Sequence, residues 1–298
     1  MFDADIARII LERLAHALAA PTRAAWPLRI GMATAGWVDD QRAARLAAFP
    51  DIFVVDNTGV TFQPTLDDES SRSAALADVA ACLAAEGALS PWRNELYAVA
   101  PTFGALPWFR LERAAARYFG VHTWAAHLNG VVRATQGTRM WFARRSPDKA
   151  LDPGMLDNLV GGGIAAGASR EATLVKEAWE EAGIREDLSA RALPAGALHI
   201  WRERPDGLQS ETIFVSDLWL PDSFVPDNQD GEAVAHRLVP LDAAAQLIAL
   251  HDGPDQVTAD ASLVVLDFLL RQGEFDLASP VFGNLSALRH PQAAARRA

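Results

Sequence analysis

Three glutamates near the middle of the chain have a spacing that suits metal binding. Glu177, Glu180 and Glu181 are related as i, i+3 and i+4, so on a helix their carboxylates share one face. Like charges held this close repel, and the helix dipole disfavours anions near a helix C-terminus. A hard cation such as Mg²⁺ relieves both penalties, because it takes oxygen ligands from carboxylates and substrate phosphates. The simpler alternative is a solvated acidic face.

The residues around the glutamates predict the helix that positions them. Ser169 is a favourable N-cap residue, and Gly183 suits the left-handed position that follows a helix. We therefore predict a helix over residues 169–182. A glycine-rich turn precedes it, formed by Gly161, Gly162, Gly163 and Gly167.

This segment resembles the Nudix box, G-x5-E-x7-R-E-U-x-E-E-x-G-U, in which U is a bulky aliphatic residue. Gly162 matches the first glycine, the three glutamates match the R-E and E-E positions, and Gly183-Ile184 match the end. The sequence departs from the box at Ala168, Lys176 and Ala178, where the box has glutamate, arginine and a bulky aliphatic residue. Lysine keeps the charge of arginine but not its planar fork.

The resemblance implies a metal site and a reaction. Glu177, Glu180 and Glu181 would hold Mg²⁺ or Mn²⁺, with the Gly161 carbonyl as a further ligand and Glu181 as the indispensable one. Nudix enzymes cleave a diphosphate linked to a second group by metal-assisted attack of water on phosphorus. The resemblance therefore implies a hydrolase acting on a small-molecule diphosphate.

Further short matches are similar to a narrower group, the thiamine-pyrophosphokinase-associated Nudix proteins. They lie at Phe119–His122, His127–Gly130, Trp141–Ser146 with Lys149, Pro153–Asn158, Pro226–Glu232 and Phe268–Arg271. The resemblance covers roughly residues 110–275 and extends to the domain ahead of them. It implies hydrolysis of thiamine diphosphate or its oxidised derivatives.

Other site residues follow from the same resemblance. Glu232 is the candidate general base and Glu211 its reserve, although Glu232 reads equally well as an exposed turn residue. Arg144, Arg145 and Lys149 lie just ahead of the box and could bind phosphate oxygens, or they form a solvated hairpin end.

Histidines and tryptophans on the expected strands have two interpretations each. His122 and His127 fit hydrogen-bonded core positions better than ligand contacts. Trp124, Trp141 and Trp201 could stack on a heterocycle, but strand aromatics usually belong to a core.

Composition excludes several other classes. The formal net charge of −11 over 298 residues argues against a broad nucleic-acid surface. Cys82 is the single cysteine, so an internal disulfide and multi-cysteine zinc sites are excluded. No apolar stretch reaches the ~20 residues of a membrane span, and the charged N-terminus does not resemble a signal peptide. We expect a cytoplasmic protein without nucleic-acid or membrane partners, and a homodimer is left open.

Apolar periodicity divides the chain into two units and a tail. Over residues 1–115 the apolar pattern predicts a smaller α+β domain of unknown role, with helices at 3–20, 70–89 and 110–118. Over residues 116–280 the pattern predicts an α/β unit with a mixed sheet between helices, and the resemblance implies that this unit is a Nudix α/β/α sandwich. Residues 281–298 are expected to form a flexible tail.

Four functional hypotheses remain from the sequence. The first is Mg²⁺-dependent hydrolysis of thiamine diphosphate or its oxidised forms. The second keeps the chemistry but takes a nucleotide sugar, ADP-ribose or a dinucleotide. The third is a non-catalytic Nudix-like binding module, which has little use for three retained glutamates. The fourth, isopentenyl-diphosphate isomerase, needs an active-site cysteine, and Cys82 lies outside the domain.

Overall fold

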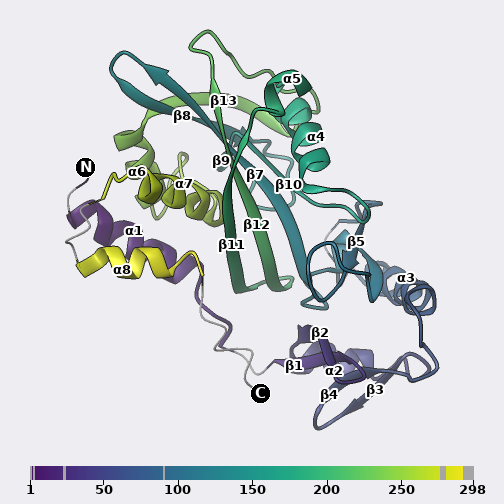
Figure 1. Ribbon diagram of the computed structural model, residues 1–298. Coiled ribbons are helices and arrows are strands. Elements are labelled where there is room, and N and C mark those ends of the chain that lie inside the picture. The colour runs from purple at the N-terminus through teal and green to yellow at the C-terminus, as the bar shows by residue number, and fades with distance from the viewer. Residues whose placement is uncertain (1, 3, 23–24, 90, 276–279, 291–298) are drawn as a thin grey trace.

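The computed structural model (Figure 1) describes residues 2, 4–22, 25–89, 91–275 and 280–290. Its larger part is built on a sheet of seven strands. They are β7 (His122–Ala134), β8 (Gly137–Arg145), β9 (Leu156–Asn158), β10 (Val160–Gly163), β11 (Leu193–Arg204), β12 (Gly207–Leu220) and β13 (Ala233–Pro240). The order is β11-β12-β7-β8-β13, with β10 paired to β7 and β9 to β8. β12 runs parallel to β7 and the other pairs are antiparallel, so the sheet is mixed as predicted.

Helices cover both faces of this sheet. One face packs against α4 (Arg170–Ala182) and α5 (Glu186–Ser189), and the other packs against α6 (Leu241–Ala249) and α7 (Ala259–Arg271). Residues alternate along the strands as this arrangement requires: Leu128 and Leu218 lie in the core under α4, whereas Ile213 and Val215 lie in the core under α7. The predicted α/β/α sandwich is confirmed.

The two outermost helices correct the domain division made from the sequence. α1 (Ala4–Ala17) buries Ile10 and Leu14 in the core formed by α6 and α7, although we had assigned it to the N-terminal domain. α8 (Pro280–Ala287) lies alongside α1 and buries Leu285 in the same core (Figure 1). Residues 280–287 therefore do not form a flexible tail, because their apolar side chains complete this layer. Residues 291–298 lie outside the described residues.

Arg13 provides a test of how α1 is attached. Its guanidinium is buried and donates hydrogen bonds to the carbonyl oxygen of Ile248 (2.7 Å), to Ser262 Oγ (2.8 Å) and to the carbonyl oxygen of Val257. Arg13→Ala leaves these buried acceptors unpaired, so we expect a loss of roughly 3–5 kcal/mol in the free energy of unfolding. Arg8→Ala is the control, because Arg8 is exposed on the same helix. Urea unfolding that gives equal stabilities for both variants would contradict this attachment.

The N-terminal domain has a separate core and its own sheet. A four-stranded sheet, ordered β2-β1-β4-β3, contains one parallel pair, β1 with β4. Its elements are β1 (Trp26–Ile30), β2 (Ala33–Val38), α2 (Asp40–Leu46), β3 (Phe53–Asp56), β4 (Gly59–Phe62) and α3 (Glu69–Ala85). Asp68 caps α3 by accepting a hydrogen bond from the Ser71 backbone N–H (2.7 Å). In the described part of the chain, each helix is too short or too polar to span a lipid bilayer.

The helix predicted over residues 110–118 does not form. The chain instead makes the hairpin of β5 (Leu96–Val99) and β6 (Phe109–Glu112), followed by the 3₁₀ turn η1 (Arg113–Ala115). Phe109 and Leu111 are buried while Arg110 between them is exposed, which is the two-residue period of a strand. Arg113 thus follows a strand end rather than lying inside a helix.

Candidate active site

Helix α4 forms as the sequence predicts and places its acidic face beside strand β10. Ser169 Oγ accepts a hydrogen bond from the backbone N–H of Ala172 (3.0 Å), and Gly183 ends the helix with φ of 63°. Ala178 and Ala182 are buried against the sheet. Small side chains on this face let the helix approach the glycine strand closely, so the glutamates on the adjoining face reach that strand.

Glu181 is fixed by the glycine strand. Its Oε2 accepts a hydrogen bond from the backbone N–H of Gly161 (2.8 Å). Burial raises the pKa of Glu181 well above its usual 4.5, and the neighbouring carboxylates Asp157 and Glu177 raise this pKa further. Gly161 lies opposite His127 in the pairing of β10 with β7, but its N–H donates to Glu181. Gly161 and His127 are therefore a non-hydrogen-bonded pair of the antiparallel ladder, in which the Gly161 carbonyl also points away from β7.

Glu177 lies against the next glycine. A Cβ atom at Gly162 would approach Glu177 Oε1 to 2.8 Å, closer than real Cβ atoms come. Burial raises the pKa of Glu177. Lys176 Nζ donates to Glu177 Oε1 (3.0 Å) and to Glu180 Oε2 (2.6 Å), so its ammonium lies between two of the three carboxylates.

The donors near β10 fit a hard divalent cation. Two half-buried carboxylates, Glu177 and Glu181, have raised pKa values that a nearby positive charge would lower, and the Gly161 carbonyl lies on the same side of β10. Glu180 is directed to Lys176 instead. Among the described residues, no three Asp, Glu, His or Cys side chains converge into a preformed metal site. The structure therefore gathers two of the three predicted glutamates.

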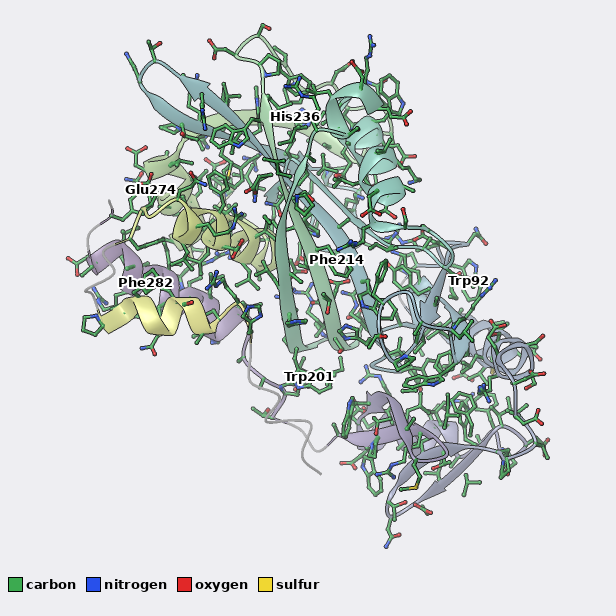
Figure 2. All side chains as sticks on the ribbon, in the orientation of Figure 1. Trp92, Trp201, Phe214, His236, Glu274 and Phe282 are labelled. Carbon is green, nitrogen blue, oxygen red and sulfur yellow. The ribbon has the colours of Figure 1, made fainter. Side chains whose placement is uncertain are left out.

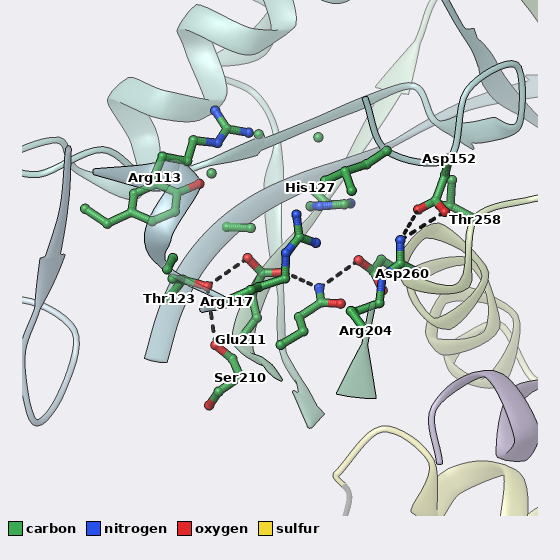
Figure 3. Close-up of a pocket in the computed structure, with 18 of the residues that line it drawn as sticks. Arg113, Arg117, Thr123, His127, Asp152, Arg204, Ser210, Glu211, Thr258 and Asp260 are labelled. Atoms are coloured by element: carbon green, nitrogen blue, oxygen red, sulfur yellow. Dashed lines mark hydrogen bonds and ion pairs between the residues drawn. The ribbon is translucent and has the colours of Figure 1, made fainter. Parts of the chain in front are cut away.

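A cavity of about 180 Å³ opens next to the glycine strand (Figure 3). A hydrogen-bonded polar network crosses its floor. Glu211 accepts from Thr123 Oγ1 (3.1 Å) and Gln209 Nε2 (3.0 Å), and Gln209 Nε2 also donates to Asp260 (3.0 Å). Glu211, the reserve candidate for the general base, thus lies in the cavity wall.

Arg145 is the predicted phosphate-binding residue that reaches the cavity. It is already held by Asp157 (2.7 Å) and by the Leu151 carbonyl oxygen (2.9 Å). Arg144 is not part of the cavity lining and donates to the Gly154 carbonyl oxygen (2.9 Å) and to Asp255. Because successive strand residues point to opposite faces, Arg144 and Arg145 project from opposite sides of β8 and do not line the same site.

Lys149 and the first-choice base, Glu232, also lie outside the cavity lining. They form an ion pair with each other, and the Glu232 side chain is 41% exposed. The two residues stabilise the connection around the end of β8, where the backbone N–H of Ser146 donates to the Glu232 carbonyl oxygen (2.8 Å).

His122 and His127 both lie on β7 but face opposite sides of the sheet, as their five-residue separation requires. His127 lines the cavity, packs against Gly161 and forms a hydrogen bond between its Nδ1 and Asn158 Oδ1 (2.9 Å). His122 forms hydrogen bonds with Ser210 Oγ and Thr212 Oγ1, each at 2.9 Å, and does not line the cavity. His122 is therefore structural, whereas His127 borders the site.

The three tryptophans considered for stacking do not line the cavity. Trp124 is buried in the core under α4, and Trp141 packs against that core. Trp201, labelled in Figure 2, meets the Trp37 ring of the N-terminal domain edge to face, with ring centroids 6.3 Å apart. A stacking wall made of these residues is therefore not present.

Sequence reasoning missed the cavity residues supplied by the N-terminal domain. They include Tyr97 on β5, Arg113 in η1 and Arg117 in the following turn. A Cβ atom at Gly163 would overlap the Tyr97 hydroxyl, so this tyrosine lies directly on the glycine strand. The available signal was the pair Arg113 and Arg117, in the segment that the sequence analysis assigned to a helix over residues 110–118.

Comparisons with known proteins identify the family. Residues 126–261 match the NUDIX domain, and residues 12–123 match a domain of unknown function, DUF4743. Nudix hydrolase 24, chloroplastic, from Arabidopsis thaliana is 38% identical over 252 residues, which cover 84% of this chain and 68% of that protein. The chain belongs to the Nudix hydrolase family. The resemblance to the Nudix box is thereby confirmed.

A second plant relative and a solved structure are also similar to this chain. Nudix hydrolase 20, chloroplastic, from Arabidopsis thaliana is 38% identical over 247 residues, covering 80% of this chain and 65% of that relative, just under two thirds of its length. The crystal structure of a protein from Deinococcus radiodurans aligns with a TM-score of 0.42 and 22% identity, covering 58% of this chain and 97% of that one.

Proposed function

We propose that this Nudix protein hydrolyses the diphosphate of a small molecule, using bound Mg²⁺ or Mn²⁺. The observation that carries the proposal is the half-buried Glu181 carboxylate, hydrogen-bonded to Gly161 beside Glu177 and next to a cavity. Water attacks one phosphorus, the P–O–P bond breaks, and the products are a monophosphate and inorganic phosphate. When bound, the divalent cation neutralises charge on the diphosphate and lowers the pKa of water.

The chain's own groups have separate roles in this reaction. Glu177 and Glu181 would hold the cation with the Gly161 carbonyl, and Lys176 keeps Glu180 and Glu177 together. We place Glu211 ahead of Glu232 as general base, because Glu211 lines the cavity whereas Glu232 is paired with Lys149 outside it. A proton from water would be taken by a carboxylate oxygen of Glu211.

We infer that the substrate is thiamine diphosphate or one of its oxidised derivatives. The motif matches described for residues 110–275 support this choice. The cavity floor supports it too, since the Glu211 carboxylate suits a substrate group with amino donors or positive charge. A nucleotide sugar, ADP-ribose or a dinucleotide is the alternative.

The test is product formation with a panel of substrates. With Mg²⁺, we expect the chain to convert thiamine diphosphate or an oxidised analogue to the monophosphate and phosphate, separated by ion-exchange chromatography. Thiamine monophosphate is the matched control without a diphosphate bond. EDTA should abolish the reaction and excess Mn²⁺ should restore it, because the metal stabilises the developing charge. Turnover that persists in EDTA, or inactivity on the whole panel, would refute the proposal.

A further inference from the structure

The segment between η1 and β7 is fixed between the two parts of the molecule. On one side, the Phe119 carbonyl oxygen accepts a hydrogen bond from the Trp37 backbone N–H (3.0 Å) of β2. On the other side, the Arg117 carbonyl oxygen accepts from the Leu208 backbone N–H (2.8 Å) at the start of β12. A Cβ atom at Gly207 would overlap that same carbonyl oxygen. The turn that carries Arg117 is therefore seated on the sheet of the Nudix domain.

The Nudix domain's own arginines in the cavity are neutralised by carboxylates. Arg145 pairs with Asp157 (2.7 Å), Arg202 pairs with Asp260 (2.7 Å), and Arg204 pairs with Asp152 (3.1 Å). Glu211 adds a further carboxylate to the floor. Each of these three guanidinium groups thus already has a carboxylate partner within its own domain.

The N-terminal domain adds two further arginines, Arg113 and Arg117, to the cavity lining (Figure 3). Arg113 donates to Glu95 (2.7 Å), and its guanidinium lies 5.7 Å from the centre of the Tyr97 ring. Its charge acts on Glu177 of the metal-binding face. Arg117 Nε lies 3.0 Å from Asp206 Oδ2, in the turn between β11 and β12. Both side chains line the cavity.

We propose that the N-terminal domain is part of the substrate site, where Arg113 and Arg117 bind the phosphate oxygens of the diphosphate. This inference rests on the proposed function, since it places a diphosphate in the cavity. Guanidinium groups suit phosphate oxygens because they donate two parallel hydrogen bonds. The N-terminal domain thereby forms one side of the substrate site, and its contact with β12 sets the distance between these arginines and Glu177.

Equilibrium binding of inorganic pyrophosphate to the full chain in Mg²⁺ buffer tests this assignment. Arg113→Gln and Arg117→Gln should each weaken binding about 10-fold, since each removes charge-assisted hydrogen bonds. Arg113→Lys and Arg117→Lys keep the charge and should recover part of the loss. Arg110→Gln is the matched control, because Arg110 is an exposed residue of β6 paired with Glu69 and lies outside the cavity.

Thermal melting establishes that each variant is folded. Dissociation constants for Arg113→Gln and Arg117→Gln equal to that of Arg110→Gln would overturn the inference, as would failure of the wild type to bind pyrophosphate. Hydrolysis is measured separately. A wild type that binds pyrophosphate through these arginines but cleaves no substrate of the panel would refute the proposed function and leave this assignment supported.

Discussion

Glu181→Gln is expected to lower turnover by about 10³-fold and to stabilise the metal-free protein. Loss of the carboxylate removes a metal ligand, whereas the amide oxygen can still accept the hydrogen bond from Gly161. The pKa of Glu181 is raised in the folded protein, so the folded state binds a proton more tightly than the unfolded state. Stability therefore falls as the pH rises above the unfolded pKa, and it continues to fall until the pH passes the raised folded pKa.

The measurements separate the two effects. In EDTA at pH 7, the variant should melt at a higher temperature than the wild type, and the difference should disappear below about pH 4. Mg²⁺ should raise the melting temperature of the wild type but not that of the variant. Glu171→Gln is the control, because Glu171 is an exposed residue in the first turn of the same helix. Wild-type turnover by Glu181→Gln would remove Glu181 from the site.

Gly162→Ala is expected to reduce kcat about 100-fold without unfolding the chain. The added Cβ would overlap the Glu177 side chain, so the carboxylate must leave its position beside the glycine strand. A displacement of about 1 Å in a positioned group costs about this much in rate. The backbone itself accepts alanine, since Gly162 is not among the glycines with positive φ.

Gly283→Ala provides the matched control for this substitution. Gly283 lies in α8, has no heavy atom within 4 Å of an added Cβ, and lies outside the cavity lining. Steady-state kinetics over a range of Mg²⁺ concentrations should show that Gly162→Ala alone needs a higher Mg²⁺ concentration for half-maximal activity. Equal kcat values and equal Mg²⁺ dependence in the two variants would show that the position of Glu177 is unimportant.

The sequence predicted the parts of the site that depend on local signals. Ser169, Gly183 and the glutamate spacing lie within 15 residues, and helix α4 begins and ends where they indicate. The convergence of Glu177 and Glu181 on the glycine strand follows from that helix. Glu180 lies on the same acidic face, where Lys176 donates to both Glu180 and Glu177, so its role in metal binding stays a prediction.

Contacts between residues far apart in the sequence determine the positions that could not be predicted from the sequence. Arg144 and Arg145 are adjacent in sequence, yet only Arg145 reaches the cavity, because alternate strand residues face opposite sides. The segment containing Arg113 contains good helix formers, but the pairing of β6 with β5 overrides that propensity. Its role in the cavity depends on the packing of two domains, which no short pattern encodes.

The packing of α1 has a consequence for how the molecule can move. The chain leaves the Nudix body after Ala17 and returns to it at His122, so the N-terminal domain is an insertion joined at two places. An inserted domain cannot separate from its host by bending at a single linker. Any widening of the entrance beside Arg113 and Arg117 thus has to bend both connections and break the hydrogen bond between Leu208 and Arg117.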